Sequence, residues 1–228
     1  MRNCTVILKK QLKDTLKNKV TLIQFIMFPV LTLVMENAIT LDGMPELFFT
    51  KLFSVMYIGM APVTSTAAII AEEKEKNTLR VLMMANVTPW QYLLGVGFYV
   101  WSVCMIGAVV MGTGFPPDQI PFYMMIMAIG LMISVFVGAC VGILAKNEMT
   151  ATSLVVPVMM LLSFLPMLAM FNDKIKIVSR VFYTRQLQML LEYMAFDGAK
   201  VADTFILSGN AILMLVVFIL SFRQRGLE

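Results

Sequence analysis

The sequence predicts an all-α membrane protein, a single transmembrane domain over residues 1–228 with six transmembrane helices. Of its residues, 59% are hydrophobic and 14% are charged, and the mean hydropathy of +0.83 lies far outside the range of soluble globular domains. A bilayer core of ~30 Å requires about 20 apolar helical residues to cross it. Stretches that meet this requirement cover residues 20–41, 52–71, 90–113, 120–145, 151–171 and 205–222.

The continuous apolar character of these stretches favours helices over barrel strands, which would alternate over about ten residues. Glu36 interrupts the first stretch, and only the turn-like GTGFPPDQIP separates the third from the fourth. Five or seven spans are therefore the alternatives to six. No small-residue cleavage pattern follows the basic N-terminus, so we expect no signal peptide.

Residues 1–19 predict an amphipathic helix that lies on the membrane surface. Cys4, Leu8, Leu12 and Leu16 recur every four residues, and lysines occupy the other side of such a helix. The leucines would enter the acyl boundary while the lysines contact anionic headgroups. The alternative is a basic topology signal without a fixed structure.

The distribution of basic residues predicts the orientation. With the N-terminus inside, twelve of the 18 Lys and Arg residues fall on the cytoplasmic side. Because these residues accumulate in short cytoplasmic loops, we expect a multi-pass protein of the cell membrane with both termini in the cytoplasm. The lipid bilayer is then an obligatory partner, and no nucleic-acid partner is expected.

The fourth predicted span carries a stripe of small residues on one face. Gly130, Ser134, Gly138 and Gly142 follow one another at intervals of four. Such a stripe lets another helix approach closely. It predicts a packing seam, either within the subunit or between subunits.

Residues 172–204 predict two short external helices between the fifth and sixth spans. Leu187, Leu190, Leu191 and Met194 follow the spacing of one helical face. The segment also carries basic residues that either anchor it to headgroups or surround the exit of a transport path. These are Lys174, Lys176, Arg180 and Arg185.

The connector over residues 72–90 combines many charges with a short apolar cluster. EEKEK is expected to continue the second span as a charged helix, and Asn77 to end that helix in the left-handed conformation. Residues 78–84 then form a short helix with Leu79, Leu82 and Met83. These side chains either contact a partner protein or rest on the membrane surface.

The end of the connector predicts the start of the third span. Thr88 is the expected N-cap, Pro89 the first helical residue, and Gln91 the residue that reaches back to the cap. Trp90 is expected at the membrane interface. Thr88, Pro89 and Trp90 together would anchor the connector to the span.

The stretch EKEKNTLRVLMMANVTPWQYLLG resembles the signature between the second and third spans of type 2 ATP-binding-cassette (ABC) transporter permeases. The resemblance extends over nearly the whole chain, from the amphipathic N-terminal helix to the external helices before the sixth span. Asn77 stands where that family most often has glycine, and asparagine tolerates the same backbone region.

This resemblance implies that the connector is a coupling helix, which docks on a nucleotide-binding ATPase subunit. By this similarity the docking residues are Glu73, Glu75, Thr78, Leu79 and Leu82. It also implies a second permease subunit, as a homodimer or a related heterodimer. ATP and magnesium would then be held by the ATPase, with no cofactor on this chain.

The motifs that the sequence lacks support a division of labour of this kind. The chain has no Gly-x-x-x-x-Gly-Lys-Ser/Thr motif for nucleotide phosphates and no histidine for a metal site or a catalytic base. We therefore expect a transport subunit without catalytic residues. Candidate residues for a substrate path are Glu36, Thr64, Ser65 and Thr66, although a solvated helix end is the alternative for Glu36.

The predicted function is that of an ATP-driven exporter of an amphipathic substrate, such as a drug, an antimicrobial peptide or a lipid-linked molecule. A non-transporting membrane scaffold or sensor subunit is one alternative, and a secondary multidrug carrier is another. Few carboxylates interrupt the spans, which disfavours a carrier driven by protons or sodium.

Overall fold

The computed structural model describes residues 10–13, 15, 19–39, 43, 45–193 and 201–225, and every regular element in them is a helix. A short 3₁₀ turn, Gly112–Gly114, follows the third of the long helices. The α-helices are α2 (Lys19–Ala38), α3 (Phe48–Glu75), α4 (Thr78–Met84), α5 (Pro89–Met111), α6 (Ile120–Leu144), α7 (Glu148–Leu168), α8 (Asp173–Ser179), α9 (Tyr183–Tyr193) and α10 (Val201–Arg225).

Four helical segments in the described residues are long and apolar enough to cross a membrane. They are Phe48–Glu75, Trp90–Gly114, Ile120–Leu144 and Glu148–Leu168, and they coincide with the four central predicted spans. The helices α2 and α10 contain shorter apolar stretches, Leu22–Ala38 and Ile206–Leu220. The all-helical prediction is thus confirmed for these residues, and the count of six spans stays a prediction.

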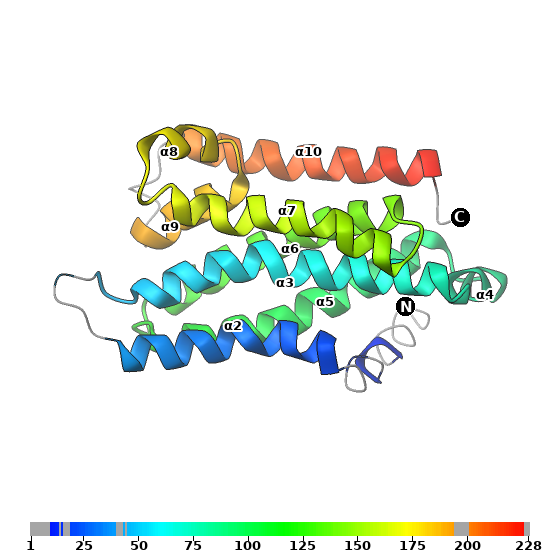
Figure 1. Ribbon diagram of the computed structural model, residues 1–228, viewed down its shortest axis with the longest axis horizontal. Helices are drawn as coiled ribbons and strands as arrows, with labels where there is room; N and C mark the ends of the chain where they lie inside the picture. The colour runs from blue at the N-terminus through cyan, green and yellow to red at the C-terminus, as the bar shows by residue number, and fades with distance from the viewer. Residues whose placement is uncertain are drawn as a thin grey trace.

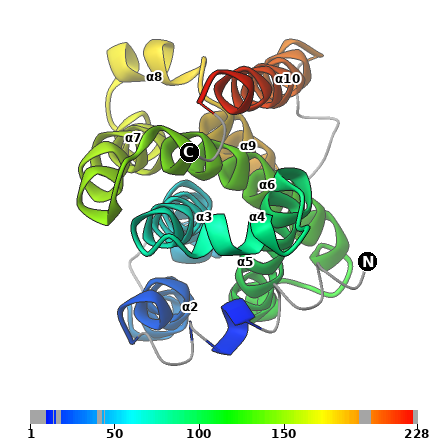
Figure 2. The same cartoon turned by 90° about the vertical axis from the view of Figure 1, so that its right-hand side faces the viewer.

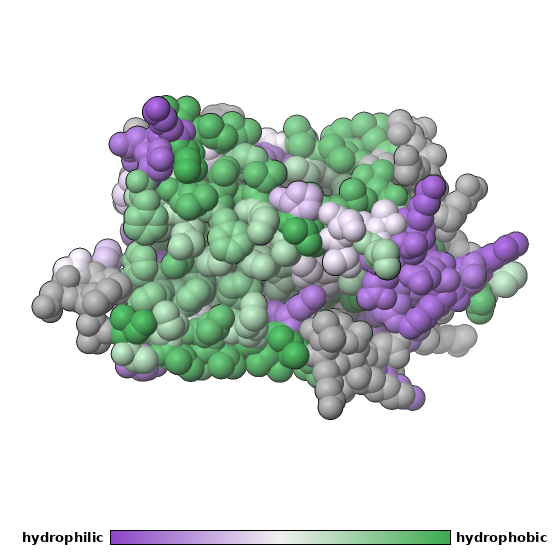
Figure 3. All heavy atoms as spheres, viewed as in Figure 1, coloured by the Kyte–Doolittle hydropathy of each residue, from purple (hydrophilic) through white to green (hydrophobic). Residues whose placement is uncertain are grey.

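The long helices run side by side along the longest axis of the molecule (Figure 1). The short helix α4 lies at one end, here called the α4 end, with the start of α2 and the end of α10, whereas α8 and α9 lie at the opposite end (Figure 1). The space-filling view shows a mostly hydrophobic band between these ends, with hydrophilic residues gathered most strongly at the α4 end (Figure 3). This distribution suits a protein that crosses a bilayer along its long axis.

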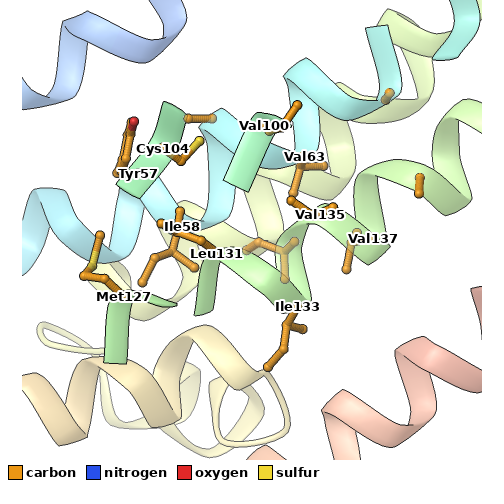
Figure 4. Close-up of a cluster of buried hydrophobic side chains, with 14 of the residues drawn as sticks. Tyr57, Ile58, Val63, Val100, Cys104, Met127, Leu131, Ile133, Val135 and Val137 are labelled. Carbon is orange, nitrogen blue, oxygen red and sulfur yellow. The ribbon is translucent and has the colours of Figure 1, made fainter. Parts of the chain in front are cut away.

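The core lies where α3 and α6 meet at the centre of the bundle (Figure 2). In their most apolar windows 72% of α3 and 78% of α6 is buried, against only 28% of α7, so α7 is a peripheral helix. The labelled core side chains in Figure 4 come from α3, α5 and α6. They are Tyr57, Ile58, Val63, Val100, Cys104, Met127, Leu131, Ile133, Val135 and Val137.

The small-residue stripe of α6 explains this close packing. A methyl group added to Gly138 would come within 2.6 Å of the carbonyl oxygen of Val63, and one added to Gly142 within 2.9 Å of Ile70 Cβ. Both neighbours belong to α3. The stripe therefore faces another helix of the same subunit. Because glycine has only a hydrogen atom as its side chain, the backbones of α3 and α6 can approach closely at these positions.

The other two positions of the stripe face α9 as well. A methyl group on Gly130 would come within 2.7 Å of the side chain of Leu187. The hydroxyls of Ser134 and Tyr183 lie 2.7 Å apart. The sequence predicted Leu187 and Leu191 on one face of a helix, and both are completely buried.

Two predicted segments fall partly outside the described residues. The predicted surface helix over residues 1–19 is described at residues 10–13 and 15, all of them helical, and from residue 19 onward, where α2 begins. The predicted external segment over residues 172–204 contains α8 and α9, while residues 194–200, with Met194, lie outside the described part.

Candidate functional site

The hairpin between α3 and α5 is built by two asparagine turns. Asn77 has φ = 54° and separates α3 from α4, and Asn86 has φ = 60° after the end of α4. Asparagine tolerates this left-handed region better than most residues other than glycine. The predicted left-handed Asn77 is confirmed, so the hairpin geometry does not require the glycine of related sequences.

The predicted start of α5 is also confirmed. Thr88 is the N-cap, Pro89 is the first helical residue, and the Thr88 side chain accepts a hydrogen bond from the Gln91 N–H at 3.4 Å. In return the Gln91 side chain accepts from the Thr88 N–H at 3.2 Å, which completes a capping box. The ring of Trp90 packs edge-on against Phe218 of α10, with a centroid distance of 5.6 Å.

The apolar face of α4 divides differently from the prediction. Leu79 is only 2% exposed and belongs to the main core, and Leu82 packs partly buried against it. Among the side chains of α4 that the structure describes, the exposed apolar ones are Val81 and Met84, at 58% and 71%. The predicted side chain of Met83 lies outside that description. Leu79 thus holds α4 onto the bundle, with its side chain buried in the core.

Glu73, another predicted docking residue, is also directed inward. Its carboxylate accepts hydrogen bonds from the Lys10 amine at 2.7 Å and from the Gln11 amide at 2.5 Å. Glu73 is 6% exposed. A buried carboxylate requires such partners, so Glu73 attaches the N-terminal segment to the end of α3. The sequence could not identify these partners because they lie 62 and 63 residues away.

The next two residues bind the turn between α6 and α7. The Lys74 amine donates to the carbonyl oxygen of Ile143 at 2.9 Å, near the C-terminus of α6. The Glu75 carboxylate accepts from the N–H of Glu148 at 2.9 Å, at the N-terminus of α7. A cation at a helix C-terminus and an anion at a helix N-terminus both complement the helix dipole. The predicted docking residue Glu75 therefore links the hairpin to α7.

The remaining charged pair of the connector lies on the surface. Lys76 and Glu72 form an i,i+4 ion pair on exposed side chains, within the charged helix that the sequence predicted. Such pairs contribute only ~0.3–0.5 kcal/mol. Thr78, the last of the predicted docking residues, is half-buried at the start of α4.

A cavity of about 420 Å³ lies between α2, α3 and α7, and one predicted path residue lines it. This residue is Thr64, whose hydroxyl lies 3.3 Å from the Gln24 side-chain oxygen. The polar lining consists of Gln24, Thr64, Thr152 and Glu148. The apolar lining consists of Met27, Phe28, Met60, Ala61, Ala68, Ala151, Val155, Val156 and Met159.

The other predicted path residues lie elsewhere. Ser65 is buried, with its hydroxyl 3.3 Å from the Gln24 side-chain oxygen, and Thr66 is buried beside Gly138. Gln24 was missed as a candidate, although a lone amide within an apolar span was a visible signal. Its amide lies beside two hydroxyls of α3 and borders the cavity.

Glu36 is not among the residues that line this cavity. Its carboxylate accepts from the Thr50 N–H at 2.8 Å and from the Thr50 hydroxyl at 3.0 Å. Thr50 is in the first turn of α3, where backbone N–H groups have no helical partner. Glu36 therefore caps α3 from a neighbouring helix and does not line the cavity.

Tyr183 attaches α9 to the core at the end opposite α4. Its side chain is only 1% exposed. Burial raises the pKa of the Tyr183 phenol well above its usual value, and the hydrogen bond with Ser134 opposes part of that rise. The phenol therefore stays neutral and forms its hydrogen bond at any ordinary pH.

Comparison with known proteins identifies one relationship. A family model described as "ABC-2 family transporter protein" matches residues 7–223. The search of curated proteins found no match. Within the described part of the chain, no group of three or more His, Cys, Asp and Glu side chains is placed to hold a metal ion.

Proposed function

The chain belongs to the ABC-2 family of transporter proteins, and from that membership we propose that it is the membrane subunit of an ATP-driven exporter. Membership of this family suggests the permease of an ABC transporter, which is a membrane subunit and is not itself catalytic. The energy would come from a separate ATPase subunit that binds ATP and magnesium. The cell membrane is the proposed location, with both termini and α4 in the cytoplasm.

The α3–α5 hairpin is the proposed contact with the ATPase. This proposal rests on the exposed side chains of α4 and on the hydrogen bonds that join the base of the hairpin to the bundle. The buried Leu79 packs α4 against the bundle, whereas Val81 and Met84 of the same helix are exposed. Lys74 and Glu75 bond the base of the hairpin to α6 and α7. A force applied to α4 would therefore reach three long helices without bending the hairpin.

The docking surface that follows from this geometry differs from the one that the resemblance implied. Exposed side chains of α4, with Val81 and Met84 as the apolar centre, would contact the ATPase. Arg80 is also exposed on this short helix. Glu73, Glu75 and Leu79 would instead transmit the motion, because each of them contacts another part of the bundle.

The cavity between α2, α3 and α7 is the proposed start of the substrate path. Its lining combines an amide, two threonine hydroxyls and a carboxylate with three methionines and other apolar side chains. Flexible methionines suit sites that accept several apolar ligands. The lining therefore favours an amphipathic cargo, such as a drug, an antimicrobial peptide or a lipid-linked molecule.

A second permease subunit would complete this path. Only 28% of the α7 apolar window is buried, so most of this helix is available to lipid or to another subunit. One chain closes the cavity on the sides of α2, α3 and α7. A homodimer or a related heterodimer that meets along the predicted span of α7, from residue 151 onward and so beyond Met149, would close the remaining side.

Substitution of Met84 tests the proposed docking surface. The chain would be copurified with its ATPase subunit in wild-type form and as Met84→Glu. Met149→Glu is the matched control, because Met149 is 80% exposed on α7 and its substitution makes the same change. We expect Met84→Glu to reduce copurification and ATP hydrolysis at least tenfold, whereas Met149→Glu retains both.

Two other results would count against the proposal. Unchanged hydrolysis in Met84→Glu would remove α4 from the docking surface, and equal losses in both variants would extend that surface to α7. Transport by the purified chain in vesicles with a proton gradient and no ATP would identify a secondary carrier. Copurification without ATP-dependent transport of any amphipathic probe would favour the scaffold or sensor function.

A further inference from the structure

A second cavity, of about 440 Å³, lies at the end opposite α4. It is enclosed by the start of α3, the residues after α7, and the short helices α8 and α9. Its charged and amide side chains are Lys51, Lys176, Arg185, Gln188 and Glu192. Its other lining residues are Pro45, Phe48, Leu52, Ala169 and Met170.

Arg185 is the unusual group in this cavity. It is only 6% exposed, and one terminal nitrogen donates to the Gln188 side-chain oxygen at 2.6 Å. Glu192 lies 3.9 Å from the same nitrogen, beyond hydrogen-bond distance. Among the described residues the Arg185 Nε has no hydrogen-bond partner. Among the described residues, the buried guanidinium therefore has only Gln188 as a hydrogen-bond partner, with Glu192 as an ion-pair partner.

The charges of the described residues that line this cavity also fail to balance. Lys51, Lys176 and Arg185 supply three positive charges and Glu192 supplies one negative charge, which leaves an excess of two. No ion pair joins Lys51 or Lys176 to a carboxylate within the described residues. Arg185 is buried and Lys51 is half-buried, and such charges are costly without a counter-charge. The cavity therefore favours an anion with more than one negative charge.

We infer that this cavity binds a phosphate group. A guanidinium presents paired donors that match phosphate oxygens, and lysines add point charges. A phosphate monoester carries a charge of about −1.5 to −2 at neutral pH, which matches the excess of two. The Arg185 guanidinium, which lines the cavity, would donate to the phosphate, and the two lysine amines would approach its other oxygens.

The source of the phosphate is either a lipid headgroup or a free phosphate ion. Phe48, Leu52 and Met170 place apolar surface beside the charges, which suits the glycerol and first methylenes of a lipid. This cavity is separate from the one between α2, α3 and α7, since no residue lines both. The site would thus couple α8 and α9 to α3 through a ligand at the far end of the bundle.

Thermal unfolding of the detergent-purified, delipidated full chain tests the site at constant ionic strength. The probes are inorganic phosphate, dihexanoyl phosphatidic acid and, as the reference, dihexanoyl phosphatidylcholine. We expect a saturable rise in the midpoint of unfolding with phosphatidic acid, with phosphate, or with both. A lower half-saturating concentration for phosphatidic acid identifies the lipid headgroup, and an equal or lower one for inorganic phosphate identifies the free ion.

Three variants decide whether the cavity is responsible. Arg185→Gln should raise the half-saturating concentration about tenfold, because a charge-assisted hydrogen bond is removed. Lys176→Gln changes an exposed residue whose loss leaves the fold intact, and should raise it about threefold. Arg180→Gln is the matched control, since Arg180 is exposed, carries the same charge and does not line the cavity.

The inference is overturned by either of two results. One is the absence of a saturable shift with both phosphate probes in the wild-type chain. The other is an equal effect of Arg180→Gln and Lys176→Gln, which would show attraction by total charge alone. Neither result depends on ATP hydrolysis or on Met84, so this test stands apart from that of the proposed exporter.

Discussion

The amine of Lys74 lies 2.9 Å from the carbonyl oxygen of Ile143, so the end of α3 is bonded directly to the last turn of α6. The adjacent Glu75 accepts from the N–H of Glu148 in α7. The positive Lys74 thus contacts the C-terminal end of α6, and the negative Glu75 contacts the N-terminal end of α7. In both cases the charge has the sign that the helix dipole favours. The base of the α3–α5 hairpin is a junction of three helices.

Removal of this junction should loosen α7 locally. In Glu75→Ala the N–H of Glu148 loses its side-chain acceptor, at a cost of about 1 kcal/mol. Hydrogen exchange at residues 148–151 should accelerate, and the unfolding midpoint should fall by a few degrees. The control is Glu72→Ala, which removes only the surface pair with Lys76; comparable exchange rates in the two variants would contradict the assigned role of Glu75.

The pair between Lys10 and Glu73 should stabilise the chain more than an ordinary surface contact. Lys10→Met leaves a buried carboxylate with Gln11 as its remaining donor, and should cost about 1–3 kcal/mol. Lys13→Met changes an exposed lysine of the same segment and should cost under ~0.5 kcal/mol. Thermal unfolding in detergent measures both.

A second substitution separates charge from packing at this pair. Adding Glu73→Gln to Lys10→Met removes the uncompensated negative charge, so part of the lost stability should return. If the double variant were instead less stable than Lys10→Met, the uncompensated charge of Glu73 would not be the cause of the lost stability.

Glu36 should matter as a cap of α3. Glu36→Ala removes the acceptor for both the N–H and the hydroxyl of Thr50, and should lower the free energy of unfolding by about 1–2 kcal/mol. Glu46→Ala is the control, because it removes the same charge from an exposed position nearby. If Glu36→Ala instead abolishes transport and leaves the unfolding midpoint unchanged, Glu36 belongs to the substrate path after all.

The two glycines Gly138 and Gly209 should respond oppositely to alanine. In Gly138→Ala the new methyl group meets the Val63 carbonyl oxygen at 2.6 Å, and because that atom is backbone, α3 and α6 must separate. We expect a loss of about 2–3 kcal/mol. Gly209 in α10 has no atom within 4 Å of the new methyl group, so Gly209→Ala should gain about 0.5–1 kcal/mol. If the two variants unfolded at the same midpoint temperature, the close packing of α3 against α6 at Gly138 would be contradicted.

The helices and the hairpin turns were predictable because their causes are local. Apolar runs of about twenty residues overlap the long helices, although those at 20–41 and 151–171 extend past the ends of α2 and α7. Asn77 adopts the expected left-handed conformation, and Thr88 and Gln91 form the expected capping box. Each of these depends on residues within a few positions of one another. The spacing of small residues in α6 likewise predicted a packing seam. The sequence did not identify the helix on the other side of the seam, which is α3.

The roles of individual polar and apolar side chains could not be read in this way. Leu79 and Glu73 looked like surface residues of a loop, yet both are buried. Glu36 looked like a solvated helix end or a path residue, yet it caps α3. In each case the deciding partner lies far away in the chain, and no local pattern encodes it.

The amino-acid order alone thus specified a helical membrane protein with a capped hairpin, since hydropathy, backbone preference and capping act over short distances. Packing decided the rest: which side of α4 is exposed, how three helices join at its base, and which charged groups, Arg185 among them, line the cavity at the opposite end. Those features depend on the burial of charge and on close approach between distant segments, which arise only when the chain folds.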